Sequence, residues 1–105
     1  MSDIITGGTQ ADTLNGGDGY DVIQGGAGND YIDGGRDDDE LYGGAGNDII
    51  KGGTGDDTIV GGLDNDKLYG DAGQNTFIFN DGDGRDTIFF GRGTDTLEIL
   101  EIGRA

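Results

Sequence analysis

The chain carries a pair of glycines every nine residues, and this spacing is the strongest constraint on its fold. The pairs begin at Gly7, Gly16, Gly25, Gly34, Gly43, Gly52 and Gly61. In each of these nine-residue units, position six is aspartate, and position eight is leucine or isoleucine. An eighth unit, residues 70–78, has Asn75 and Phe77 at these positions. Helix is disfavoured, because each glycine costs a helix about 1 kcal/mol relative to alanine. A repeat this short indicates a solenoid.

Each unit combines six turn-forming residues with three residues that can form a strand. Glycines at positions one, two and four permit tight curvature and positive φ. The other three residues make a minimal strand, with position eight directed inward and positions seven and nine outward. One unit then spans half a circuit, so two units form one coil and alternate units stack in two parallel sheets. We therefore predict an all-β solenoid with a thin core of Leu, Ile and Phe.

The chain divides into three segments within a single domain. Residues 1–6 are expected to form an N-terminal cap strand, and residues 7–78 form the repeats. Phe79 and Asn80 interrupt the register, and residues 79–105 hold degenerate repeats and a C-terminal cap. The open end of a solenoid needs such a cover. The four phenylalanines are expected to supply it, and they are Phe77, Phe79, Phe89 and Phe90.

The composition excludes several classes of function. With neither cysteine nor histidine, the chain has no thiolate nucleophile, no Ser-His-Asp triad and no zinc site of thiolates or imidazoles. Six basic residues against 22 acidic ones disfavour nucleic-acid binding, and the apolar runs are too short to span a bilayer. Residues 1–3 have neither the basic nor the apolar region of a signal peptide, so we expect no cleaved secretory signal. We expect a protein that is not an enzyme.

The acidic residues imply a metal partner. A chain with 31% hydrophobic residues and a net charge of -16 is expected to be disordered unless its acids are neutralised. Stacking places the aspartate of one unit beside that of the unit two further on, in sheets with a strand spacing of ~4.8 Å. Carboxylates and carbonyls at six or more positions are typical calcium ligands, whereas Mg²⁺ demands octahedral geometry and zinc prefers N and S. About six or seven Ca²⁺ ions would nearly balance the charge.

These motifs resemble the RTX (repeats-in-toxin) family of haemolysin-type calcium-binding repeats, whose consensus is GGxGxDxUx with U a large apolar residue. The likeness is close over residues 7–78 and looser over residues 81–98. It implies a right-handed parallel β-roll with two repeats per coil that folds on binding about six Ca²⁺ ions or more. It also implies a secreted protein exported by a type I apparatus without a cleaved N-terminal signal, in which the repeats accompany an effector domain.

The resemblance also implies six sets of calcium ligands. In the family, each ion takes carbonyl oxygens from positions two and four, and the aspartate, of one turn. It also takes carbonyls from positions one and three, and the aspartate, of the turn two repeats on. The sets implied here are Gly8, Gln10 and Asp12 with Gly25, Ala27 and Asp30; Gly17, Gly19 and Asp21 with Gly34, Arg36 and Asp39; Gly26, Gly28 and Asp30 with Gly43, Ala45 and Asp48; Gly35, Asp37 and Asp39 with Gly52, Thr54 and Asp57; Gly44, Gly46 and Asp48 with Gly61, Leu63 and Asp66; and Gly53, Gly55 and Asp57 with Gly70, Ala72 and Asn75.

Some positions depart from the consensus. Position four is Gln10, Asp37 or Asp64 instead of glycine, which predicts either strained turns or an extra acid at the site. Asn75 removes a charge and is expected to weaken the sixth set. The interruption disfavours a further set built from Gly62, Asp64, Asp66, Asp83 and Asp86, and a set using Asp95 is disfavoured still more.

Two other interpretations remain open. The chain could be a carbohydrate-associated module beside a polysaccharide-modifying enzyme, which would require a stripe of basic and aromatic residues along one sheet. The residues available for such a stripe are Arg36, Lys51, Lys67, Tyr31, Tyr42 and Tyr69. Alternatively, it could be an isolated or engineered scaffold of the same repeats.

Overall fold

Three-residue strands joined by tight turns make up the described part of the chain. The computed structural model describes residues 4–79, 87–91 and 95–99. No helix long and apolar enough to cross a membrane occurs in these ranges. The strands are β1 (Ile4–Thr6), β2 (Thr13–Asn15), β3 (Val22–Gln24), β4 (Tyr31–Asp33), β5 (Glu40–Tyr42), β6 (Ile49–Lys51), β7 (Thr58–Val60), β8 (Lys67–Tyr69), β9 (Thr76–Phe79), β10 (Thr87–Phe89) and β11 (Thr96–Ile99).

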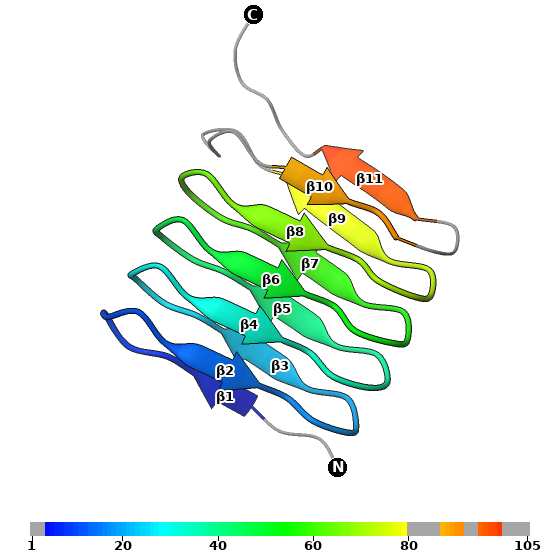
Figure 1. Ribbon diagram of the computed structural model, residues 1–105, viewed down its shortest axis with the longest axis horizontal. Helices are drawn as coiled ribbons and strands as arrows, with labels where there is room; N and C mark the ends of the chain where they lie inside the picture. Colours follow the sequence, from blue (N-terminus) through cyan, green and yellow to red (C-terminus); the bar gives the residue numbers. More distant parts are fainter. Residues whose placement is uncertain (1–3, 80–86, 92–94, 100–105) are drawn as a thin grey trace, which may run out of the picture.

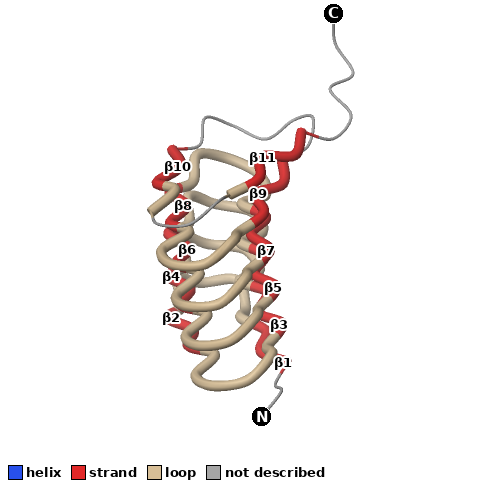
Figure 2. The backbone as a smooth tube through the Cα atoms, turned by 90° about the vertical axis from the view of Figure 1, so that its right-hand side faces the viewer, coloured by secondary structure: helices blue, strands red, loops and turns tan. Residues whose placement is uncertain are grey.

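Alternate strands stack into two sheets that face each other (Figures 1 and 2). The odd-numbered strands form a six-stranded sheet and the even-numbered strands a five-stranded one. All pairs are parallel, and the inward residues are in register, as with Ile23 opposite Leu41 and Ile32 opposite Ile50. This confirms the predicted parallel β-roll, in which two nine-residue units make one coil.

The last coil is longer than the others. Lys67 of β8 pairs with Thr87 of β10, and Thr76 of β9 pairs with Thr96 of β11, so these partners are twenty residues apart instead of eighteen. The two additional residues lie between Thr76 and Thr87. The register interruption read from the sequence falls in this interval.

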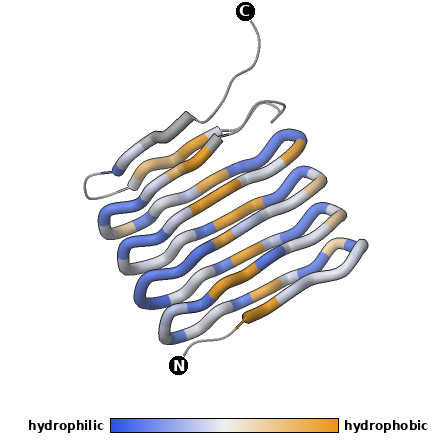
Figure 3. The backbone as a smooth tube through the Cα atoms, turned by 180° about the vertical axis from the view of Figure 1, so that it is seen from behind, coloured by the Kyte–Doolittle hydropathy of each residue, from blue (hydrophilic) through white to orange (hydrophobic). Residues whose placement is uncertain are grey.

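A single column of position-eight side chains forms the core. Among the side chains that the structure describes, the seven fully buried apolar ones all occupy this position, and they are Ile23, Ile32, Leu41, Ile50, Ile59, Leu68 and Phe77. Ile5, Leu14 and Ile88 pack against them and are partly buried. Figure 3 shows that apolar residues lie along the strands and polar residues at the turns. Because the core is one side chain wide in each sheet, the turns contribute much of each coil's structure.

The two ends of the column differ. The ring of Phe90 meets that of Phe77 edge to face, with 5.4 Å between centroids, so Phe90 packs against the last core residue. Phe89 instead lies on the outer face, where it stacks on Tyr69 at 4.6 Å. The expectation that it covers the core is therefore wrong. At the other end β1 is the outermost strand, and Ile4 is 81% exposed.

Candidate metal centre

The aspartates at position six form two buried columns, one along each edge of the roll where the turns enter the strands. One column contains Asp12, Asp30, Asp48 and Asp66, and the other contains Asp21, Asp39, Asp57, Asn75 and Asp95. From Asp21 to Asn75 each of these side chains is at most 3% exposed. Buried carboxylates in such number need partners.

One oxygen of each inner carboxylate has a backbone partner. In seven of the described position-six residues, the N–H donates to Oδ1 of the residue one coil further on, which ties successive turns together. The donor and acceptor pairs are Asp12 to Asp30 (2.8 Å), Asp21 to Asp39 (2.8 Å), Asp30 to Asp48 (2.7 Å), Asp39 to Asp57 (2.8 Å), Asp48 to Asp66 (2.7 Å), Asp57 to Asn75 (2.8 Å) and Asn75 to Asp95 (2.8 Å).

The second oxygen is buried without a hydrogen-bond partner in Asp30, Asp39, Asp48 and Asp57. Burial disfavours the charged form. It raises the pKa of Asp39 to about 7 and that of Asp48 to about 7. Burial also raises the pKa of Asp57 to about 8, and it raises that of Asp30. Either a proton or a cation would therefore offset the buried negative charge of these carboxylates.

The glycine at position one leaves room beside this unpaired oxygen. An ideal Cβ on Gly43 would lie 2.6 Å from Oδ2 of Asp48 and 2.5 Å from the carbonyl oxygen of Gly61. A carboxylate oxygen of one turn and a carbonyl oxygen of the turn two repeats on therefore flank the same small space. The arrangement recurs at Gly16, Gly25, Gly34 and Gly52.

The carbonyls of positions two and four lie against the matching glycines of the next coil. An ideal Cβ on Gly44 would lie 2.3 Å from the Gly26 oxygen, and one on Gly46 would lie 2.2 Å from the Gly28 oxygen. Gly26 and Gly28 have φ values of 86° and 94°, a backbone conformation that glycine adopts readily. These carbonyls therefore border the space between two coils, and the six complete ligand sets stay a prediction from the family pattern.

The position-three residues also link successive coils through their backbone N–H groups. Their N–H groups donate to position-two carbonyls of the preceding coil, as from Ala27 to Gly8 (3.0 Å), Arg36 to Gly17 (2.9 Å), Thr54 to Gly35 (2.9 Å) and Leu63 to Gly44 (3.1 Å). A carbonyl oxygen has two lone pairs, so each of these acceptors can still coordinate a cation.

The aspartates at position four have left-handed backbone angles and accept hydrogen bonds from the preceding coil. Asp37 and Asp64 have φ values of 71° and 72°, the left-handed region that aspartate tolerates better than most residues. Oδ2 of Asp37 accepts the Gly19 N–H at 2.8 Å, and Oδ2 of Asp64 accepts the Gly46 N–H at 2.9 Å. Gln10 does not adopt a positive φ. The sequence predicted either strained turns or an extra acid at the calcium site. The positive φ values show the strained turns, and the two carboxylates accept hydrogen bonds from the coil before them.

Asp95 belongs to the ladder although the sequence ranked it last. Its Oδ1 accepts the Asn75 N–H, and its Oδ2 is buried without a partner. The signal was present in residues 95–97, which continue the repeat once a shift of two residues is allowed. Asp83 and Asp86 lie outside the described residues.

The donor set fits calcium better than other metals. Every candidate donor is oxygen, and each set combines two position-six side chains with backbone carbonyls. Within the described ranges no three acidic side chains converge on one point, so the carbonyls must supply most of the coordination. Many neutral oxygens with few carboxylates suit Ca²⁺, which accepts six to eight oxygen ligands in flexible geometry.

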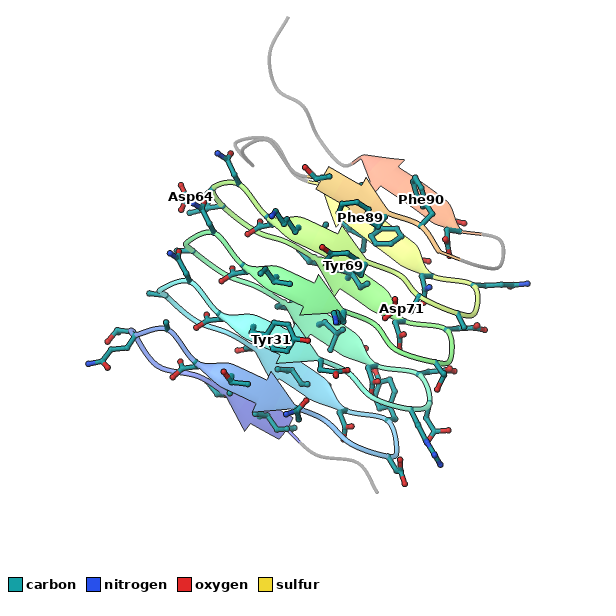
Figure 4. The ribbon with its side chains drawn as sticks, viewed as in Figure 1. Tyr31, Asp64, Tyr69, Asp71, Phe89 and Phe90 are labelled. Atoms are coloured by element: carbon teal, nitrogen blue, oxygen red, sulfur yellow. The ribbon has the colours of Figure 1, made fainter. Side chains whose placement is uncertain are left out.

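A stripe of aromatic and basic side chains crosses the outer face of the five-stranded sheet (Figure 4). Lys51 of β6 lies between two tyrosines, with Nζ 5.6 Å from the ring centre of Tyr31 and 5.9 Å from that of Tyr69. Phe89 extends the stripe by stacking on Tyr69. Tyr42 lies on the other sheet, where its hydroxyl donates to Glu40.

The chain matches the model of a known family of repeats. The model of the RTX calcium-binding nonapeptide repeat matches the chain in four copies, over residues 6–41, 16–50, 42–77 and 78–97. These ranges contain every residue of the six ligand sets. No curated protein matches the chain.

Proposed function

Since this chain belongs to the family of RTX calcium-binding nonapeptide repeats, we propose that it is a module without enzymatic activity whose folding is coupled to Ca²⁺ binding. Each ion would lie between two coils, within the six ligand sets named above. When bound, calcium supplies positive charge to the buried aspartate columns.

The unpaired Oδ2 atoms carry this proposal. Asn75 occupies the same position in its turn as the aspartates, and its Nδ2 donates to the carbonyls of Gly70 and Ala72. A carboxylate has no hydrogen to donate there. The aspartate turns therefore place acceptors beside acceptors, an arrangement that a cation relieves.

Coupling to folding follows from the charge. Without metal, the folded chain would hold buried carboxylates within a molecule of net charge -16. The unfolded chain has no preformed site, so the binding free energy contributes directly to folding. Low calcium therefore favours the unfolded chain, and high calcium favours the β-roll.

The family context gives this coupling a use. RTX repeats are typical of secreted proteins, and we place this chain outside the cell, after export through a type I apparatus and beside an effector domain. In the calcium-poor cytosol the chain would stay unfolded and fit for passage. Outside, calcium would fold it.

A calcium titration of metal-stripped protein tests the proposal. We expect far-UV circular dichroism to report a cooperative transition from coil to β-structure with Ca²⁺, and none with Mg²⁺ at equal concentration. Complete β-structure above pH 8 in excess chelator would contradict coupled folding, because the core and turns would then suffice without metal.

Saccharide binding is a second candidate, favoured by the stripe on the five-stranded sheet. The rings of Tyr69 and Phe89 are nearly parallel, at 8°, so each covers one face of the other and less aromatic surface is available to a sugar. For this reason calcium binding ranks first. Calorimetry of the calcium-loaded protein with neutral and uronate oligosaccharides provides the test: binding lost in Tyr69→Ala and kept in Tyr42→Ala would support the candidate, and no heat with either sugar would exclude it.

A further inference from the structure

Both polar atoms of the Asn75 side chain make hydrogen bonds. Its Oδ1 accepts the Asp57 N–H at 2.8 Å, as an aspartate would. Its Nδ2 donates to the carbonyl oxygen of Gly70 at 2.8 Å and, more weakly, to that of Ala72 at 3.4 Å. One neutral side chain thus forms hydrogen bonds both with the coil before it and within its own turn.

The two carbonyls that accept from Nδ2 are those that the family pattern assigns to the sixth calcium ion. The amide nitrogen also lies where the aspartates place Oδ2. An ideal Cβ on Gly70 would be 2.8 Å from Nδ2 of Asn75, and one on Gly52 would be 2.6 Å from Oδ2 of Asp57. The amide therefore presents hydrogens to oxygens that a cation would otherwise bind.

The same coil has packing that needs no metal. Phe77, next to Asn75 in the core, is fully buried, and its ring meets Phe90 edge to face at 5.4 Å. Outside the sheet, Tyr69 stacks on Phe89 at 4.6 Å. Aromatic pairs of this kind stabilise a fold beyond the area that they bury.

We propose that the side-chain amide of Asn75 replaces calcium in the sixth ligand set, so that this coil closes without metal and the other five sets bind the ions. This inference rests on the proposed function and refines it. Asp57 still has a cation within reach, because it also belongs to the fourth set, with Asp39. With asparagine in place of aspartate, the side-chain amide thus takes over from calcium as the partner of the two carbonyls, and one negative charge is lost as well.

Asn75→Asp tests the exchange along a calcium titration. Native mass spectrometry of the loaded proteins should count one more Ca²⁺ in the variant than in the parent. Hydrogen exchange should show the Gly70–Asn75 turn protected in the parent as soon as the chain folds. In the variant, two hydrogen bonds are lost and a buried charge is added, so the same turn should become protected only when the additional ion binds. Asn29→Asp adds the same charge on an exposed turn whose Oδ1 acceptor it keeps, and it should change neither reading.

The reverse exchange places an amide one coil earlier. Asp57→Asn should lower the ion count by one, because the new amide can donate to Gly52 and Thr54, and the turn at residues 52–57 should then be protected as soon as calcium at the other sets folds the chain. Equal ion counts in the parent and Asn75→Asp, together with the same calcium dependence of protection, would overturn the proposal. If neither protein binds calcium, the proposed function fails, and hydrogen exchange of the two proteins folded without metal then decides the role of the amide.

Discussion

At the scale of single residues, the position-one glycines are required by space rather than by backbone conformation. Gly43 has no positive φ, yet an ideal Cβ there would lie within 2.6 Å of both a carbonyl oxygen and a carboxylate oxygen. Both atoms belong to the coil-to-coil framework, so neither can move alone. The space that excludes a methyl group is also the space between candidate calcium ligands.

Gly43→Ala should therefore destabilise the loaded protein by about 1–3 kcal/mol, the usual cost of forcing a methyl group into filled space. Gly8→Ala is the matched control, because an ideal Cβ there has no atom within 4 Å and φ is not positive. It should change stability by less than about 0.5 kcal/mol. Urea unfolding in saturating calcium measures both; equal losses would show that the glycine pair is needed for chain flexibility instead.

At the scale of strands and turns, the nine-residue period predicted nearly everything that repeats. It gave the inward position, the two sheets, the pairing of alternate units and the aspartate columns, because each depends only on a residue's place in the unit. The period did not predict contacts between residues at different positions of the nine-residue unit. Lys51 at position nine reaches Tyr31 at position seven through the length of its side chain, which periodicity does not encode.

The candidate site was predictable to the same degree. The repeat pattern placed Asp57 and Asn75 in one column. From the change of aspartate to asparagine, it predicted only that a charge is lost. The direction in which the amide donates depends on turn geometry that a pattern of letters does not contain. Phe89 illustrates the same limit: in the shifted last coil it follows the inward Ile88 and therefore points outward.

At the scale of the whole molecule, the fold must resolve the charge of its own aspartates, and a proton can do so as well as a cation. The pKa of an aspartate is ordinarily 3.8, and burial raises it to about 7 in Asp39 and Asp48 and to about 8 in Asp57. Since the folded-state values exceed those of the unfolded chain, the metal-free fold binds more protons than the unfolded chain between these limits. Its stability therefore falls as pH rises.

We accordingly expect metal-stripped protein to acquire β-structure near pH 4 and to lose it as the pH rises through about 7 to 8, where the protons leave Asp39, Asp48 and Asp57. Saturating calcium should remove this dependence, because the ion takes the place of the proton: the protein stays folded at pH 8 with its ions bound, and near pH 4 protons replace the ions. Far-UV circular dichroism against pH, with and without calcium, measures both curves. Metal-free protein that remains a coil at every pH would show that neutralising the aspartates is insufficient, and that calcium must also bridge carbonyls of successive coils.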